Sequence, residues 1–281
     1  MTVYLIPNMK KRDVRAAVET VARCLRGLGA QVLLPLALEE TFEGQDAQFL
    51  CDADAFARCD VAVTVGGDGT ILHAAKRGLS YHRPLLGVNL GRMGFLATAE
   101  CGDSAKFERL VRGDWREDRR AVLSVRCRGK RPFESVALND LVIAKTGIGQ
   151  TVDVSIWCDG ILVNEYLGDG VVVSTPTGST AYSLSAGGPV LDARIRGLVV
   201  TPVCAHSMHS PPMVFSAERR LTIQVDSPAR GRAEMCCDGA DARVLLPEDR
   251  LEVSLSGDYI SLVSFNEADQ FAAIDKKLKG R

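Results

Sequence analysis

The sequence predicts an α/β domain followed by a β-rich domain, with a helix at the C-terminal end. Strand-like and helix-like segments alternate through the first hundred residues, which is typical of a parallel sheet whose strands are joined by helices. From residue 120 to 262, short runs of alternating polar and apolar residues follow one another, which favours a β-rich fold. We therefore predict one domain over residues 1–105, a second over 106–263, and a closing segment over 264–281.

The elements of the first domain follow from its hydrophobic pattern. Apolar residues in segment 12–28 recur at helical spacing. Segment 36–56 is polar and acidic, and we expect a loop with a short helix there. The remaining predicted elements are a helix over 69–79 and strands over 2–6, 31–35, 59–65 and 84–88.

The β-rich region contains a strong hairpin signal. Its runs VSIWC and ILVNE are joined by Asp159 and Gly160, which suit a two-residue type I′ turn. Further along, segment 267–280 is predicted to be a helix. Three of its apolar residues share one face, namely Phe271, Ile274 and Leu278.

Composition excludes several classes of partner. The formal net charge is −1, so the basic surface expected of a nucleic-acid or anionic-membrane binder is not predicted. No apolar run approaches the roughly 20 residues that span a bilayer, and the N-terminus does not resemble a secretory signal. The nine cysteines include no CxxC pair, which indicates reduced thiols in a cytoplasmic protein. The four histidines lack Cys/His spacing, so no zinc site is expected.

The first segment that can carry chemistry is VAVTVGGDGT, residues 61–70. Its glycines and Asp68 lie at the carboxyl end of a predicted parallel strand, where open α/β sheets bind ligands. Glycines allow a close backbone approach to phosphate, and the following helix offers unpaired N–H groups. The spacing matches neither a Walker A loop nor GxGxxG. The alternative is a tight strand-to-helix turn in which Asp68 caps the helix.

Residues 168–189 form the second such segment, with five glycines and seven Ser/Thr around Asp169. Hydroxyls and free N–H groups suit a ligand that carries hydroxyls and phosphates. A surface loop rich in turn residues is the alternative, although the three valines at 171–173 argue against it.

Asn139 and Asp140 are the third feature, because they interrupt an otherwise apolar strand. Buried polar groups need partners, so a ligand or an internal network must satisfy them. An internal hydrogen-bonded pair is the alternative to a ligand contact.

Together these segments resemble the NAD kinase family, which uses ATP or polyphosphate. The resemblance covers most of the chain, and its most specific part is STPTGSTAYSLSAGGPV, residues 174–190. A GGDG turn alone is weaker, since diacylglycerol-type lipid kinases and phosphofructokinases also carry it. The other similar segments are GGDGT (66–70), GRMGFL (91–96), ALND (137–140), TPVCAHSMHS (201–210) and CDGA (237–240).

The resemblance implies a Rossmann-like α/β domain, a β-sandwich-like second domain, and a C-terminal helix that returns to the first domain. It implies phosphoryl transfer to the 2′-hydroxyl of the adenosine ribose of NAD, giving NADP. Mg²⁺ or another divalent cation would be carried mainly by the donor phosphates. The expected partners are NAD and the phosphoryl donor, without nucleic acid or membrane. The protein is expected to be a cytoplasmic homo-oligomer, a dimer or a tetramer.

The resemblance also implies site residues. Asp68 matches the family's proton acceptor and is the predicted catalytic residue. His73 lies one helical turn later and matches a position that often contacts NAD, with an ordinary helix-surface residue as the alternative. The predicted substrate-binding residues are Gly66, Gly67, Gly69, Thr70, His73, Asn139, Asp140, Asp169, Thr180, Ala181, Tyr182, Ser183, Ser185 and Ala240.

Three positions differ from the family pattern. Asp140 is one methylene shorter than the usual Glu, Met93 replaces a common Leu, and Pro211 stands where Arg is common. Two rival functions remain at this point. A non-catalytic dinucleotide-binding protein would be favoured by loss of the Asp68 carboxylate, and a lipid kinase would lack the 174–190 segment.

Overall fold

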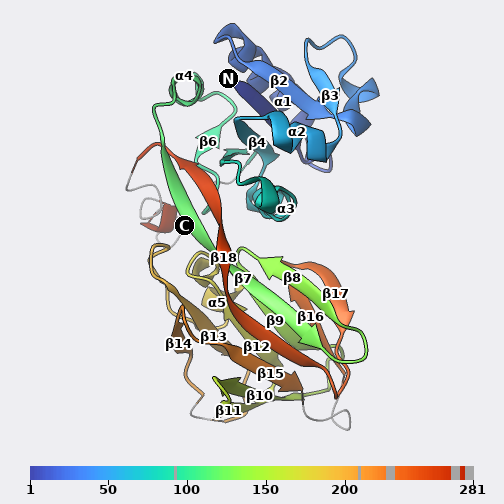
Figure 1. The fold of residues 1–281 in the computed structure, drawn as a ribbon, viewed down its shortest axis with the longest axis vertical. Coiled ribbons are helices and arrows are strands. Elements are labelled where there is room, and N and C mark those ends of the chain that lie inside the picture. Colours follow the sequence, from blue (N-terminus) through green and yellow to red (C-terminus); the bar gives the residue numbers. More distant parts are fainter. Residues whose placement is uncertain (92–93, 208–209, 226–231, 267–272, 276–281) are drawn as a thin grey trace. The chain divides into compact units, whose positions relative to one another are not determined.

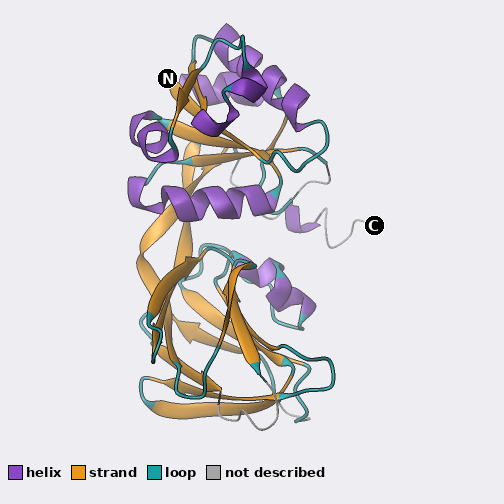
Figure 2. Cartoon of the chain, turned by 90° about the vertical axis from the view of Figure 1, so that its right-hand side faces the viewer, coloured by secondary structure: helices purple, strands orange, loops and turns teal. Residues whose placement is uncertain are grey.

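The computed structural model describes the whole chain except residues 92–93, 208–209, 226–231, 267–272 and 276–281. The chain forms two compact units (Figure 1). The first unit comprises Met1–Arg119 and Ile260–Arg281, and the second comprises Arg120–Tyr259. Helices are concentrated in the first unit and strands dominate the second (Figure 2). No helix among the described residues is long and apolar enough to cross a membrane.

The first unit is built on a parallel sheet with the strand order β3-β2-β1-β4-β5. The end of β18 (Arg250–Ser264) also pairs with β5 in parallel, through Leu262 and Leu85. Every residue of β4 is buried, as expected for a strand covered on both faces. The strands are β1 (Thr2–Pro7), β2 (Gln31–Pro35), β3 (Gln48–Leu50), β4 (Val61–Gly66), β5 (Leu85–Asn89) and β6 (Ala99–Glu100).

Helices join these strands and complete the core of the first unit. Helix α1 buries one apolar face against the sheet, and each fully buried Val or Leu contributes about 1.5–3 kcal/mol. The helices are α1 (Val14–Gly27), α2 (Asp52–Arg58), α3 (Asp68–Gly78) and α4 (Ser104–Arg112), with 3₁₀ turns at Leu36–Leu38, Glu40–Phe42 and Leu79–Tyr81. The predicted alternation of strands and helices is confirmed.

Two elements of this region were not predicted. Segment 36–56, expected as a loop with a short helix, also contains strand β3, which is too short to show an alternating pattern. Helix α4 lies before the β-rich stretch that begins at residue 120, in a segment for which no element was predicted. It buries only Phe107 and Leu110, so its apolar stripe is short, and Gly113 ends it in the left-handed conformation at φ 75°.

The second unit is a two-sheet sandwich. One sheet has the order β14-β13-β12-β9-β16-β17, and the other contains β11-β10-β15-β18, with β7 paired to β18 and β8. A single hydrophobic core draws residues from both sheets, including Val125, Ile223, Ile143 and Val173. The predicted β-rich, sandwich-like fold is therefore confirmed. The strands not yet given are β7 (Arg116–Arg128), β8 (Phe133–Ala137), β9 (Asp140–Lys145), β10 (Val152–Cys158), β11 (Ile161–Gly168), β12 (Gly170–Ser174), β13 (Gly197–Val203), β14 (Met213–Ser216), β15 (Leu221–Val225), β16 (Ala233–Cys237) and β17 (Ala240–Val244).

The predicted hairpin is present as β10 and β11. Asp159 and Gly160 both have positive φ, 50° and 84°, as a type I′ turn requires. The predicted helix over 267–280 lies mostly outside the described residues, and only 273–275 are described there, as helical.

Candidate functional site

In the first unit, polar residues gather at the carboxyl edge of the parallel sheet. Gly66 ends β4 and lies directly opposite Asn89, which ends β5. Asn8 follows β1, and its backbone N–H donates to the Val65 carbonyl over 3.0 Å. The sequence analysis missed Asn8 and Asn89, although each is a polar residue at the end of a buried apolar run.

The Thr70 side chain closes the glycine-rich turn from inside. Its hydroxyl accepts hydrogen bonds from the Gly67 N–H over 3.3 Å and from the Asn8 amide over 3.4 Å. A Cβ at Gly66 would overlap this hydroxyl, so only glycine fits there. A Cβ at Gly69 would meet nothing within 4 Å, so the backbone is open at this position. Gly66 and Thr70 therefore shape the turn, and Gly69 is the position that a ligand could approach most closely.

Asp68 holds a neighbouring loop through its carboxylate. Oδ2 accepts a hydrogen bond from the Phe95 N–H over 2.7 Å, and Oδ1 accepts from the N–H groups of Leu96 and Ala97 over 3.2 and 3.3 Å. A Cβ at Gly94 would overlap the same carboxylate. Asp68 is the first residue of α3 and Gly67 is its N-cap residue, so Asp68 does not occupy the cap position that the alternative gave it. A carboxylate has about four acceptor positions, which leaves room for one further donor.

His73 is exposed on α3. Its contact with a ligand therefore stays a prediction, and its position fits the surface-residue alternative equally well.

In the second unit, a second polar edge forms where three strands of one sheet end together. Strand β9 begins at Asp140, directly opposite Ser174, the last residue of β12. Strand β16 ends at Cys237, opposite Leu141. Because β9 is antiparallel to both neighbours, its start and their ends lie at the same edge of the sheet. Residues that are far apart in the sequence thus meet at this edge of the sheet. We call the edge formed by Asp140, Ser174 and Cys237 the β9 edge.

Asp238 organises the backbone at the β9 edge. Its carboxylate accepts hydrogen bonds from the N–H groups of Leu138, Asn139 and Asp140 over 2.8, 2.7 and 3.2 Å. Its own N–H donates to the Asp140 carbonyl over 2.9 Å. Asp238 and Gly239 both have positive φ, 53° and 69°, so the β16–β17 turn directs the carboxylate back onto β9. Ala240, half-buried, starts the next strand opposite Cys237.

The start of the 174–190 segment packs directly on the same backbone. The Thr175 N–H donates to the Asn139 carbonyl over 2.9 Å, and its hydroxyl donates to the Leu138 carbonyl over 2.6 Å. The Gly178 N–H donates to the Thr175 hydroxyl over 3.0 Å. A Cβ at Gly178 would overlap the Asn139 backbone. The Asn139 side chain is half-buried and makes no hydrogen bond with the described residues, so its amide is available to a ligand.

Asp140 is a buried carboxyl group at this edge, with 6% of its surface exposed. Burial, and then the negative charge of Asp238, raise the pKa of Asp140 to about 7. Opposite Asp140, the buried Ser174 hydroxyl has no hydrogen-bond partner among the described residues. The described residues include no hydrogen bond between the Asn139 and Asp140 side chains, and the backbone N–H groups of both residues donate to Asp238.

The raised pKa of Asp140 predicts a pH-dependent stability. The folded chain keeps a proton on Asp140 up to about pH 7, whereas an exposed carboxyl loses it near 3.8. The folded chain therefore binds more protons between these values, and the free energy of unfolding falls as pH rises through this window. We expect Asp140→Asn to stabilise the protein more at pH 8 than at pH 5, by on the order of a few kcal/mol. Urea unfolding at both pH values measures this, with Asp258→Asn, an exposed carboxylate, as the control. An equal effect of Asp140→Asn at the two pH values would contradict the prediction.

The remaining hydroxyls of segment 168–189 divide into internal and exposed ones. Ser183 is fully buried and hydrogen-bonded to the Thr201 hydroxyl over 2.8 Å. Thr180 donates to the Thr177 carbonyl over 3.2 Å. The predicted ligand residues Thr180 and Ala181 are half-buried, whereas Tyr182 and Ser185 are exposed. The surface-loop alternative for the whole segment is wrong, because it contains the buried strand β12, a 3₁₀ turn at Gly178–Thr180 and helix α5 (Tyr182–Ser185).

Asp169 lies at the opposite end of β12 from Ser174. At about 3.4 Å per residue, the five residues of β12 separate them by roughly 17 Å. The Asp169 carboxylate forms an ion pair with Lys145 at 2.6 Å. The structure therefore does not bring Asp169 to the β9 edge with Asn139 and Asp140.

Among the residues that the structure describes, no group of three or more His, Cys, Asp or Glu side chains could hold a metal ion. The two polar edges are instead rich in backbone N–H groups, hydroxyls and single carboxylates. This chemistry suits hydroxyl-bearing and phosphate-bearing ligands.

Comparisons with known proteins agree over nearly the whole chain. Residues 3–113 match the family model described as ATP-NAD kinase N-terminal domain, and residues 138–265 match ATP-NAD kinase C-terminal domain. The chain is 34% identical over 282 residues to the NAD kinase of Ruminiclostridium cellulolyticum, covering 99% of this chain and 98% of that protein. It is 34% identical over 279 residues to the NAD kinase of Symbiobacterium thermophilum, covering 98% of each.

Two solved structures share the fold. Yeast NADH kinase, solved in complex with NADH, superposes with a TM-score of 0.90 at 24% identity, covering 100% of this chain and 88% of that one. An NAD kinase from Archaeoglobus fulgidus, solved in complex with ATP, has a TM-score of 0.77 at 24% identity, covering 98% of each chain.

Proposed function

This chain belongs to the NAD kinase family, and from that premise we propose that it phosphorylates NAD to NADP. The phosphoryl group passes from ATP, or from another nucleotide or polyphosphate, to the 2′-hydroxyl of the adenosine ribose. The observation that carries the proposal is the β9 edge. There the segment most specific to the family, 174–190, packs on Asn139 and leaves its amide available to a ligand.

The first unit supplies groups for phosphate and for the reacting hydroxyl. Helix α3 begins at Asp68, so its first N–H groups and the open backbone at Gly69 can face donor phosphates. The unused acceptor position of Asp68 can bind the ribose 2′-hydroxyl and take its proton as the bond to phosphorus forms. Because the three loop N–H groups fix the carboxylate, it needs no rearrangement to orient that hydroxyl.

The second unit supplies dinucleotide contacts. The Asn139 amide can both donate to and accept from NAD, and Asp238 fixes the backbone that carries it. Near neutral pH Asp140 is partly protonated, so its carboxyl group can donate as well as accept. Exposed Tyr182 and half-buried Ala181 are the predicted contacts from the 174–190 segment.

The carboxylates and backbone groups of the two polar edges fit a Mg²⁺ ion that binds together with the phosphoryl donor. Single carboxylates and backbone N–H groups do not form a protein cage, and Mg²⁺ commonly binds through substrate phosphates with only one or two carboxylates. When bound, the ion neutralises charge on the donor phosphates.

We also propose that the protein is a cytoplasmic homo-oligomer, a dimer or a tetramer. Support comes from the edge strands of the second unit, which carry exposed apolar side chains. Ile161 on β11 is 71% exposed and Val214 on β14 is 54% exposed. Light scattering coupled to gel filtration measures the mass, and a monomer at micromolar concentration would contradict the proposal.

The decisive experiment incubates the purified protein with NAD, Mg²⁺ and either ATP or polyphosphate, and then assays NADP. NADP formation supports the kinase, and the ratio of the two rates identifies the donor. Binding of NAD without any NADP would favour the rival, a non-catalytic dinucleotide-binding protein. In a parallel incubation with diacylglycerol, phosphorylation of that lipid alcohol but not of NAD would favour the lipid kinase.

Replacing Asn139 by alanine is expected to raise the KM for NAD between about 2- and 12-fold with little change in kcat. Each lost dinucleotide hydrogen bond contributes about 0.5–1.5 kcal/mol. The backbone N–H and carbonyl of Asn139 make the internal bonds, so the fold should be unchanged. Steady-state kinetics and titration calorimetry measure the effect, with Asn164→Ala on β11 as the amide control. Unchanged NAD affinity in Asn139→Ala would show that the β9 edge is not the NAD site.

A further inference from the structure

The second unit carries a polar cavity of about 530 Å³ on the sheet that does not contain the β9 edge. Strands β7, β15 and β18 provide most of its lining. On β7 the buried residues Leu123, Val125 and Cys127 alternate with the lining residues Ser124, Arg126 and Arg128. The cavity therefore lies on the outer face of this sheet. Its polar lining includes Ser124, Arg126, Arg128, Arg220, Thr222 and Glu252.

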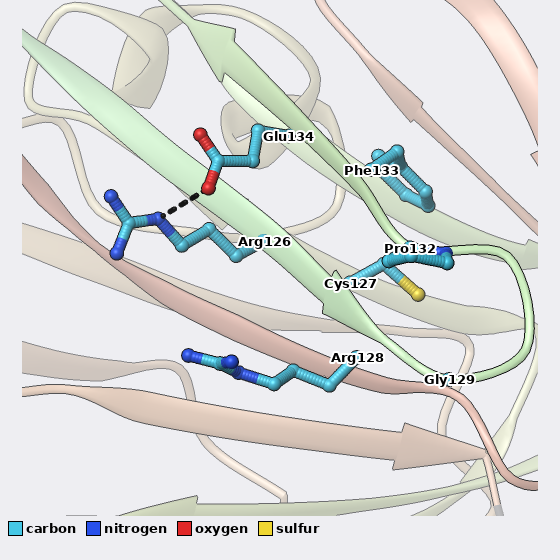
Figure 3. Close-up of a pocket in the computed structure, with 7 residues that line it drawn as sticks. All are labelled: Arg126, Cys127, Arg128, Gly129, Pro132, Phe133 and Glu134. Atoms are coloured by element: carbon cyan, nitrogen blue, oxygen red, sulfur yellow. Dashed lines mark ion pairs between the residues drawn. The ribbon is translucent and has the colours of Figure 1, made fainter.

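Two of the arginines extend together from one face of β7. Figure 3 shows Arg126 and Arg128 on the same side of the strand, with Cys127 pointing away between them. They also line an adjoining cavity of about 430 Å³ formed with the turn that leads to β8. The two cavities thus share a pair of guanidinium groups.

A third arginine comes from the other side of β18. Arg220 immediately precedes β15, and its backbone is held by the β10–β11 turn. Its N–H donates to Asp159 Oδ1 over 3.1 Å, and its carbonyl accepts from the Asp159 N–H over 2.9 Å. The charge of Asp159 is itself matched by an ion pair with Arg219 at 2.8 Å.

Positive charge exceeds negative charge around this cavity. Glu252 accepts a hydrogen bond from Arg128 over 2.8 Å, and its pKa is lowered first by Arg128 and then by Arg126 and Arg220. Arg126 also pairs with Glu134 at 3.2 Å. Three guanidinium groups therefore share two carboxylates, and both pairs are exposed. Exposed ion pairs are weak, so phosphate oxygens can replace the carboxylates at little cost.

We propose that this cavity binds an anion with a chain of two or more phosphate groups. Guanidinium groups bind phosphate oxygens in pairs, and the hydroxyls of Ser124 and Thr222 add further donors. The arginines flank β18 from β7 and β15, which places their backbones about 10 Å apart. A chain of phosphates can contact the arginines on both sides of β18 at the same time. Such a chain can come from a nucleoside triphosphate or from inorganic polyphosphate.

Titration calorimetry of the full chain with inorganic tripolyphosphate and with ATP tests the proposal. The double variant Arg128→Gln/Arg220→Gln should lose one class of binding sites, or weaken it at least tenfold. Glu252→Gln removes a competing carboxylate and should tighten the same class by about two- to fivefold. Weaker binding in the arginine variant and tighter binding in Glu252→Gln cannot both result from a general loss of folding. NADP formation should be unchanged in both variants, so failure of the kinase assay remains a separate result.

Arg12→Gln/Arg23→Gln, which removes two exposed arginines from the first unit, is the control for net charge and should bind like the wild type. Binding of both anions by the cavity supports recognition of the phosphate chain itself, and binding of tripolyphosphate alone supports an inorganic source. Binding of ATP alone, or equal affinity for orthophosphate, would overturn the proposal. Unchanged binding in Arg128→Gln/Arg220→Gln would overturn it as well.

Discussion

Asp68→Asn is expected to lower kcat by about 10²–10⁴-fold while the affinity for NAD changes little. The acceptor is a ribose hydroxyl, which is a poor nucleophile while it keeps its proton. An asparagine can still contact that hydroxyl but cannot take the proton. Because phosphoryl transfer passes through a loose transition state, orientation of the hydroxyl contributes alongside basicity. Single-turnover kinetics with saturating NAD and donor measures the transfer step directly.

The same substitution also changes the loop that Asp68 holds. An asparagine oxygen can keep the bonds from Leu96 and Ala97, but its NH₂ group would then face the Phe95 N–H. This loss should cost about 1–3 kcal/mol of stability. Asp103→Asn is a matched control, because that carboxylate likewise accepts a backbone N–H, from Glu100 over 3.0 Å. We expect the control to lose stability without losing kcat. Retention of more than about a tenth of the turnover in Asp68→Asn would leave Asp68 with a structural role alone.

Gly178→Ala is expected to reduce NADP formation by about 10²-fold and to destabilise the second unit by about 1–3 kcal/mol. The added methyl group would overlap the backbone of Asn139, which cannot rotate away as a side chain can. Either the turn at Gly178–Thr180 or the start of β9 must move, and both carry predicted NAD contacts.

Kinetics and thermal unfolding of Gly178→Ala distinguish these effects. Gly149→Ala is the control, since a Cβ there meets nothing within 4 Å and should leave both measurements near wild type. If Gly178→Ala kept wild-type NAD affinity and turnover, the close approach of these two backbones would have no part in the reaction.

Much of the fold could be predicted from the sequence because its signals are local. The buried strand before Gly66 and the Asp159-Gly160 turn each depend on neighbouring residues. Helix α4 and strand β3 could not be predicted in the same way, since their few buried residues make no clear period.

The candidate site was only partly predictable, because its contacts connect distant parts of the chain. Asp68 binds N–H groups 27 to 29 residues away, and Asp238 binds N–H groups 98 to 100 residues away. No local pattern encodes such a pairing. Conversely, Asp169 and Ser174 are close in sequence, yet an extended strand carries them to opposite ends of the sheet.

The contact between Asp68 and Gly94 makes these two positions interdependent during sequence change. A side chain at position 94 would compete for the volume that the carboxylate fills. A residue larger than glycine can therefore appear at position 94 only after Asp68 has been replaced by a smaller residue. If the larger residue came first, the loop that Asp68 holds would not fold. A chain that needs the Asp68 carboxylate for catalysis cannot take the first of these steps. The need for a carboxylate at position 68 thus excludes any side chain at position 94, although Gly94 has no side chain that could act in the reaction.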